Sequence, residues 1–108
     1  MKYRHIAEMV PVRAAKWRES HGKVVLIMPR FRSRAGKVLL RILKKDNVVR
    51  VHLDEVGSAV WLMCDGRRQV RDIAEELHRR FGERVEPLYG RLANFFMTME
   101  RQRFIRMK

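Results

Sequence analysis

Residues 53–66 constrain this 108-residue chain more than any other stretch, because they specify one complete helix together with its start and its end. Asp54 can cap the free amides of the first turn, and Glu55 places negative charge at the positive end of the helix dipole. Gly66 permits the left-handed backbone with which helices commonly end. Apolar residues recur between these signals at helical spacing, at Val56, Ala59, Val60 and Met63. A chain that contains this segment must bury one side of that helix.

Two more helices are predicted after this one. Residues 70–81 carry an apolar stripe and end before Gly82, and residues 87–102 begin at Pro87, which suits a first helical position. Residues 104 and 105 can add a short extended tail. The predicted buried stripes consist of Ile73, Ala74, Leu77 and Phe81 in one helix, and of Leu88, Leu92, Phe95, Phe96 and Met99 in the other.

The first half of the chain predicts strands. Residues 1–11 read as a loose lead-in, and residues 12–19 are weakly consistent with a strand. Residues 20–23 form a turn signal before the β-branched run 24–28, so a hairpin is predicted, and Pro29 ends its second strand. Residues 48–53 alternate in polarity and predict a third strand, which leads directly into the Asp54 cap.

Residues 30–47 form a basic insertion between the second and third predicted strands. Val38, Leu39, Ile42 and Leu43 share one helical stripe, and the opposite side holds Lys37, Arg41, Lys44 and Lys45. This pattern predicts a short amphipathic helix that ends near residues 46 and 47. A strand over residues 37–43 is the alternative.

These elements predict an α+β fold, with an N-terminal three-stranded antiparallel sheet followed by a tri-helical, winged-helix-like bundle and an extra short helix in the 30–47 insertion. The chain is long enough for one domain with one core. We therefore expect a single domain over residues 1–108, made of the lead-in 1–11, the sheet with its insertion 12–53 and the three-helix block 54–108.

The net charge of +13 is concentrated in the first half of the chain. Residues 1–53 hold 14 Lys and Arg against 3 acidic residues, whereas residues 54–108 hold 11 against 9. This imbalance favours an anionic partner. Because there is no apolar run of about 20 residues and no secretory signal pattern, we expect no membrane partner. The single cysteine excludes an internal disulfide bond and favours a cytoplasmic location.

No residue pattern indicates catalysis. The histidines at positions 5, 21, 52 and 78 lack the spacing of a metal site, and none lies near Cys64 in sequence. Cys64 is interpreted as a small buried residue, Trp61 as a core residue, and Asp54 and Asp65 as cap and turn residues. We therefore expect that the chain is not an enzyme and that it needs no cofactor.

Three segments of the second half resemble the PqqD family. They are residues 53–61 (LDEVGSAVW), residues 64–66 (CDG) and residues 70–74 (VRDIA), which are followed by Leu77 and Phe81. The family comprises small peptide chaperones of pyrroloquinoline quinone biosynthesis and their relatives, also called RiPP recognition elements. The resemblance spans residues 12–105. The chain departs from the family pattern at Gln69, where a threonine or serine cap is usual, and in its longer 30–47 insertion.

The resemblance implies a function and a site. A leader peptide is expected to dock as an added strand along residues 48–53 and to pack against the last helix, where Gly90 would let its backbone come close. Arg50 and the basic insertion would favour acidic leader residues. The implied partners are the precursor peptide and a modifying enzyme of the radical-SAM type. The predicted peptide-binding residues are Val48, Val49, Arg50, Val51, His52, Leu53, Tyr89, Gly90, Ala93, Phe96 and Met97.

The alternative function is DNA binding by a winged helix. The last helix offers only Arg91 and Arg101 within a hydrophobic sequence, whereas a helix that reads a DNA groove usually presents several polar and basic side chains. Specific nucleic-acid binding is therefore not expected. The same unpaired strand edge could also support a weak homodimer, so a monomer or a weak homodimer is predicted.

Overall fold

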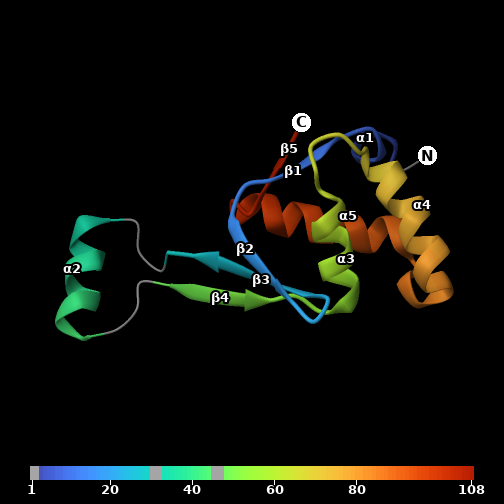
Figure 1. Ribbon diagram of the computed structural model, residues 1–108. Coiled ribbons are helices and arrows are strands. Elements are labelled where there is room, and N and C mark those ends of the chain that lie inside the picture. The colour runs from blue at the N-terminus through green and yellow to red at the C-terminus, as the bar shows by residue number, and fades with distance from the viewer. Residues whose placement is uncertain (1–2, 30–32, 45–47) are drawn as a thin grey trace.

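The computed structural model describes residues 3–29, 33–44 and 48–108 (Figure 1). It confirms the predicted α+β class. Along the chain lie α1 (Arg4–Ala7), β1 (Pro11–Arg13), β2 (Lys16–Ser20), β3 (Lys23–Met28), α2 (Arg34–Ile42), β4 (Val49–His52), α3 (Glu55–Met63), α4 (Val70–Phe81), a 3-10 helix (Gly82–Val85), α5 (Leu88–Arg101) and β5 (Ile105–Met107).

The three-stranded sheet has the order β2-β3-β4, and both pairs of neighbours are antiparallel. One row of opposed residues joins Trp17, Leu26 and Val51, and the next joins Arg18, Val25 and His52. Because side chains alternate between the faces of a sheet, the first row faces the core and the second faces outward. The predicted hairpin and the predicted third strand are therefore present, with β4 at one edge.

The predicted strand over residues 12–19 is divided into two strands that belong to different sheets. β1 pairs with the C-terminal β5, with Pro11 opposite Met107 and Arg13 opposite Ile105, whereas β2 pairs with β3. The division falls at Ala14, whose amide donates a hydrogen bond to the Phe104 carbonyl at 2.8 Å. Local pattern does not specify this pairing, because the partner strand lies about 90 residues later in the chain.

Residues 3–11, expected as a loose lead-in, are attached to the body of the protein. Ala7 is buried, and the Val70 amide at the start of α4 donates to the Met9 carbonyl at 2.9 Å. Val10 and Lys108 exchange two backbone hydrogen bonds. The two ends of the chain are thereby joined, as Figure 1 shows for β1 and β5.

The insertion contains a helix, as the preferred interpretation predicted, and not a strand. The hydroxyl of Ser33 caps α2 by accepting a hydrogen bond from the Gly36 amide at 3.1 Å. The helix ends at Ile42; the predicted end near residues 46 and 47 lies outside the described residues. Figure 1 shows α2 apart from the body, at the far end of β3 and β4.

The core is centred on α3, which lies against the sheet on one side and against α4 and α5 on the other. Trp61 is fully buried, as predicted, and its ring meets that of Trp17 edge-on at 6.4 Å. The indole Nε1 of Trp61 has no hydrogen-bond partner among the described residues, so its ring packing accounts for its position. The surrounding core includes Val24, Leu26, Val60, Ile73, Leu77, Leu92 and Phe96.

Ser58 is the buried polar residue that attaches α3 to the sheet. Its hydroxyl accepts a hydrogen bond from the Val24 amide at 2.8 Å and donates one to the Leu53 carbonyl at 3.3 Å. The serine therefore satisfies backbone groups at the start of β3 and just after β4, next to the Asp54 cap.

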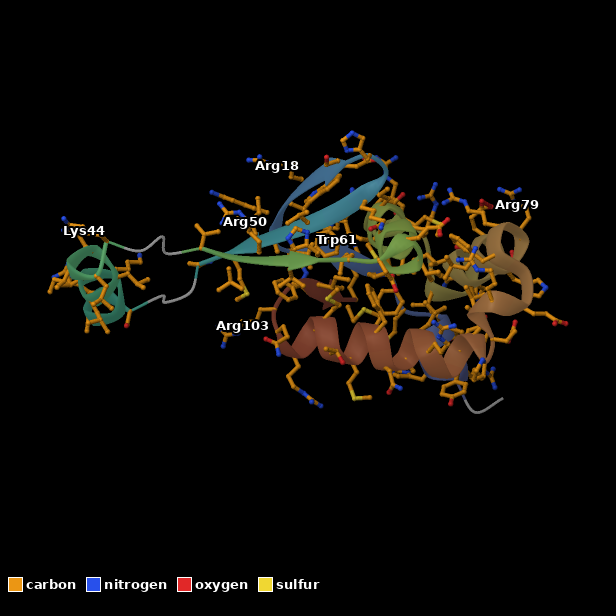
Figure 2. All side chains as sticks on the ribbon, turned by 90° about the horizontal axis from the view of Figure 1, so that it is seen from below. Arg18, Lys44, Arg50, Trp61, Arg79 and Arg103 are labelled. Atoms are coloured by element: carbon orange, nitrogen blue, oxygen red, sulfur yellow. The ribbon has the colours of Figure 1, made fainter. Side chains whose placement is uncertain are left out.

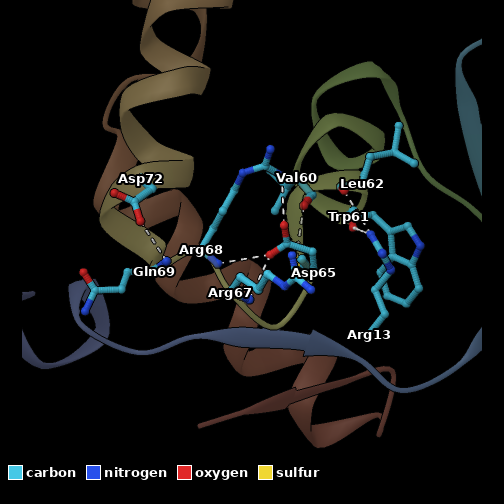
Figure 3. A network of polar contacts seen from close by, with 10 residues as sticks. Arg13, Val60, Trp61, Leu62, Asp65, Arg67, Arg68, Gln69 and Asp72 are labelled. Atoms are coloured by element: carbon cyan, nitrogen blue, oxygen red, sulfur yellow. Dashed lines mark hydrogen bonds and ion pairs between the residues drawn. The ribbon is translucent and has the colours of Figure 1, made fainter.

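Two side chains stabilise the C-terminal end of α3 and the turn that follows it (Figure 3). The Arg13 guanidinium donates to the carbonyls of Trp61 and Leu62 at 3.1 and 2.9 Å, where the helix dipole favours a cation. Asp65 accepts from the amides of Arg68 and Arg67, at 3.0 and 2.9 Å, and these hydrogen bonds hold its pKa below the usual range. Gly66 has a φ of +80°, so the predicted left-handed exit is confirmed.

Gln69 occupies the cap position of α4, where serine or threonine is the commoner choice. Its amide donates to the Asp72 carboxylate at 3.0 Å, so Asp72 satisfies the helix start from inside the first turn. The side chain of Gln69 instead donates to the Glu8 carbonyl at 3.2 Å. The unusual residue thus connects α4 to the segment that follows α1.

Cys64 is buried, as predicted, and its thiol donates to the Val60 carbonyl at 3.1 Å. Burial raises the pKa of the thiol to about 12, because the thiolate would lose its hydration; the nearby Arg13 opposes this shift only in part. The side chain is therefore a neutral core group.

Replacement of Ser58 by alanine should lower the free energy of unfolding by about 1–3 kcal/mol, because the buried Val24 amide would lose its acceptor. Urea denaturation with circular dichroism measures the loss. Ser20→Ala removes an exposed hydroxyl and should cost less than about 0.5 kcal/mol, so equal effects of the two changes would contradict the role assigned to Ser58.

The Cys64 thiol should react with Ellman's reagent far more slowly in the native protein at about pH 8 than in urea, because the buried group is protonated and covered. A pKa that is raised on folding stabilises the native state at low pH, and this stability is lost as the pH rises. The unfolding free energy of the wild type should therefore fall between about pH 9 and 12 more than that of Cys64→Ala. Rapid labelling of the native protein would contradict this assignment.

Candidate functional site

The outer edge of β4 is an unpaired strand edge. In the part of the chain that the structure describes, β4 pairs with β3 alone. The Leu53 amide donates to the Val24 carbonyl at 2.9 Å, so Leu53 directs its backbone groups toward β3. Because backbone direction alternates along an antiparallel strand, Val51 points toward β3, whereas Arg50 and His52 direct their amides and carbonyls outward. Those outward groups are available to another strand.

The face of the sheet that points away from the core is basic. On this face, Lys16 and Arg50 lie opposite each other across Ile27. Two residues further along, Arg18 and His52 lie opposite each other across Val25. The four flanking side chains are exposed. Figure 2 shows Arg18 and Arg50 on the same side of the sheet. The β4 edge therefore borders a positively charged surface.

An apolar groove of about 420 Å³ lies where β4 meets α3 and α5. Phe95 is one of its aromatic walls: its ring is 3.7 Å from the position that a Cβ on Gly57 would take, and it packs edge-on against Phe96 at 5.4 Å. The absence of a side chain at Gly57 thus keeps the groove open beside Phe95. The lining comprises His52, Leu53, Asp54, Val56, Gly57, Val60, Leu77, Val85, Leu88, Arg91, Leu92, Phe95 and Met99.

The charged groups at the groove have structural partners. Asp54 caps α3 by accepting from the Gly57 amide at 2.7 Å, as the sequence predicts. Arg91 donates to the Arg84 carbonyl at 2.8 Å, and the Arg84 guanidinium is 3.4 Å from the Glu55 carboxylate. The groove is therefore suited to apolar side chains, with hydrogen-bonding capacity supplied by the adjacent strand edge.

The structure divides the predicted site residues between two places. Residues 48–53 form β4 and its continuations at both ends; His52 and Leu53 line the groove, whereas Val48 lines a separate cavity beside β2 and β3. The predicted residues of α5 lie on another side of that helix and face α1. Tyr89 stacks on Tyr3 with ring centroids 6.3 Å apart, and a Cβ on Gly90 would lie 3.4 Å from the Tyr3 hydroxyl. Tyr3 thus occupies the space beside Gly90 in which the sequence predicted the backbone of a bound peptide.

The remaining predicted residues of α5 also lie away from β4. Ala93, Phe96 and Met97 line a separate cavity of about 300 Å³ with residues of the N-terminal segment. Phe96 is itself part of the core, with 1% of its surface exposed. The strand half and the helix half of the predicted site therefore do not meet.

The helix residues that do border β4 are Leu88, Arg91, Leu92, Phe95 and Met99. Four of them belong to the stripe that the sequence predicts to be buried. The sequence could not separate groove residues from core residues here, because the difference is only whether other parts of the protein cover them completely. Gly57 was the signal available in the sequence, because a glycine inside a predicted helix can mark a place where another group comes close to the helix. In the structure that group is the Phe95 ring.

This arrangement can bind a chain noncovalently. The described residues include no group of three or more His, Cys, Asp or Glu that could hold a metal ion. Within the same residues, no helix has both the length and the apolar character needed to cross a membrane.

Comparison with protein families matches residues 38–105, well over half of the chain, to "Coenzyme PQQ synthesis protein D (PqqD)". The matched region runs from α2 through β4 and the helical block to the first residue of β5. Comparisons with curated proteins and with solved structures found no match. Members of the matched family are non-catalytic accessory proteins with a peptide-binding role related to the synthesis of pyrroloquinoline quinone. The chain belongs to the PqqD family.

Proposed function

We propose that this protein binds the leader segment of a ribosomally made precursor peptide by strand addition to β4, and presents the rest of the peptide to a modifying enzyme. The single observation that carries the proposal is the unpaired β4 edge running into an apolar groove. Family membership supports a peptide as the ligand.

The backbone of the peptide would supply the affinity along the strand. An extended peptide beside β4 can exchange hydrogen bonds with the outward amides and carbonyls of Arg50 and His52. These groups face solvent in the free protein, so the peptide has to displace only the water molecules bound to them. Backbone pairing of this kind is largely independent of the peptide sequence.

The groove would supply the specificity. Side chains of an added strand alternate between the two faces of the sheet, so every second residue of the peptide would turn toward the core side, where the groove lies. A volume of about 420 Å³ is within the range of pockets that hold small ligands, and its walls are mainly aliphatic and aromatic. We therefore expect the leader to place apolar residues at alternate positions.

The remaining side chains of the peptide would meet the basic face of the sheet. Arg50 lies on β4 itself, and Arg18 and Lys16 lie on β2 across β3. Opposite charges at neighbouring positions stabilise cross-strand pairs, so acidic residues are expected at these positions of the leader. The modifying enzyme is proposed to be of the radical-SAM type, and any iron–sulfur cluster would belong to that enzyme.

His52→Pro should weaken leader binding about tenfold or more, because proline lacks the outward amide that the peptide would use. His52→Ala is the matched control: it removes the imidazole, keeps the amide and should change the affinity less than about threefold. Isothermal titration calorimetry with synthetic leaders of small precursor peptides encoded near the gene measures both affinities. Equal binding by the proline variant would exclude strand addition at this edge.

Phe95→Ala should weaken the same leader about tenfold or more, because the groove loses the aromatic ring of its wall. Met97→Ala truncates an exposed residue on the α1 side of α5 and should leave binding unchanged. Circular dichroism melting shows whether each variant folds, and NMR shift mapping should place the peptide along residues 48–57 and 88–99. Loss of binding in Met97→Ala alone would instead favour the site predicted from the sequence.

A further inference from the structure

We propose that α2 is an interfacial helix that attaches this protein to the surface of an anionic lipid bilayer. The proposal is independent of the peptide-binding function, since it concerns a helix outside the β4 groove. It rests on three observations. The apolar side of α2 is exposed, the charged residues described in the helix and at its end are all basic, and the helix lies away from the body of the protein.

The apolar side of α2 lacks a partner among the described residues. Four aliphatic residues on this side, three in α2 and one just after it, retain much of their accessible surface, with 43% for Val38, 49% for Leu39, 70% for Ile42 and 53% for Leu43. Leu40 lies at another angle of the helix and is buried. Such residues are usually covered in a folded protein, and these four account for most of the large hydrophobic residues exposed in the described chain. A contiguous exposed apolar face of this kind marks a binding surface.

The shape of this face suits a flat surface better than a narrow groove. At 3.6 residues per turn, the four side chains cover roughly 140° of the helix surface. They form two neighbouring pairs along the helix, Val38 with Ile42 and Leu39 with Leu43. A helix that docks into a protein groove usually presents a single line of anchors. A patch two residues wide can instead enter the boundary between lipid headgroups and acyl chains.

The charges on α2 determine the sign of the surface. Arg34, Lys37 and Arg41 are the charged residues of the helix, and Lys44 follows its end, so all four are basic. They lie on the side opposite the exposed patch, and their long stems can extend along an apolar layer while the charges reach lipid phosphates. A second copy of α2 would carry the same basic charges and offer them no acidic partner among the described residues, whereas an anionic bilayer does, which favours the bilayer as the occupant.

The position of α2 leaves it free to contact a surface. Figure 2 shows Lys44 at the far end of the molecule from Trp61 and the helical block. The longest principal dimension of the protein is 51 Å, against 29 and 22 Å for the others. The expectation that no membrane is involved followed from the missing 20-residue apolar run, and an interfacial helix needs no such run.

Sedimentation with vesicles tests the proposal on the full chain. The probes are vesicles of phosphatidylcholine alone and of phosphatidylcholine with about 30% phosphatidylglycerol, in about 0.15 M NaCl. The wild type should bind the anionic vesicles at least about tenfold more tightly than the neutral ones. Leu39→Gln/Ile42→Gln keeps the charge and uses a good helix former, and it should reduce that binding at least about tenfold.

Met97→Gln is the matched control, because Met97 is an equally exposed residue on the body of the protein, and it should leave vesicle binding unchanged. Equal binding by the double variant would overturn the proposal, since the net charge alone would then explain the association. Absence of wild-type binding would also overturn it. If the double variant then loses a dimer or a protein partner that the wild type retains, α2 is a protein-docking surface instead.

Discussion

The burial of α3 is the constraint on which the rest of the structure depends. Trp61 and Val60 are enclosed by the sheet on one side and by α4 and α5 on the other, so each of these elements is positioned by the same helix. Polar contacts at its two ends complete the arrangement: Ser58 attaches the helix to β3, and Arg13 closes its carbonyl end. Since α3 follows directly from β4, this packing also places the β4 edge beside α5.

The candidate site exists because that packing is incomplete at one place. Gly57 leaves space beside Phe95, and the groove opens where α3, α5 and the end of β4 meet. The other side of α5 is closed by α1 and the N-terminal segment, with Tyr3 stacked on Tyr89. One helix therefore serves as core, as groove wall and as support for the N-terminus, and its sides differ only in what covers them.

The surface properties of the two parts of the molecule differ for a physical reason. The helical block carries compensating charges, such as Glu76 with Arg79 and Arg80, whose proximity lowers the pKa of Glu76 to about 2. Among the described residues, the basic face of the sheet and α2 hold cations with no acidic residue on the same face or in the same helix. An anionic peptide or an anionic surface would therefore be attracted to the sheet and to α2 before any contact with the helical block.

The sequence by itself determined the elements whose information is local. Asp54, Gly66 and Gly82 act where the capping and turn rules place them, α4 has the predicted bounds, and the insertion forms a helix. Only the tertiary structure decided that residues 12–19 are divided between two sheets and which side of α5 faces β4. Periodicity identifies the apolar side of a helix, but it contains no information on whether a strand, an N-terminal segment or solvent covers each part of that side, because covering depends on contacts between distant residues.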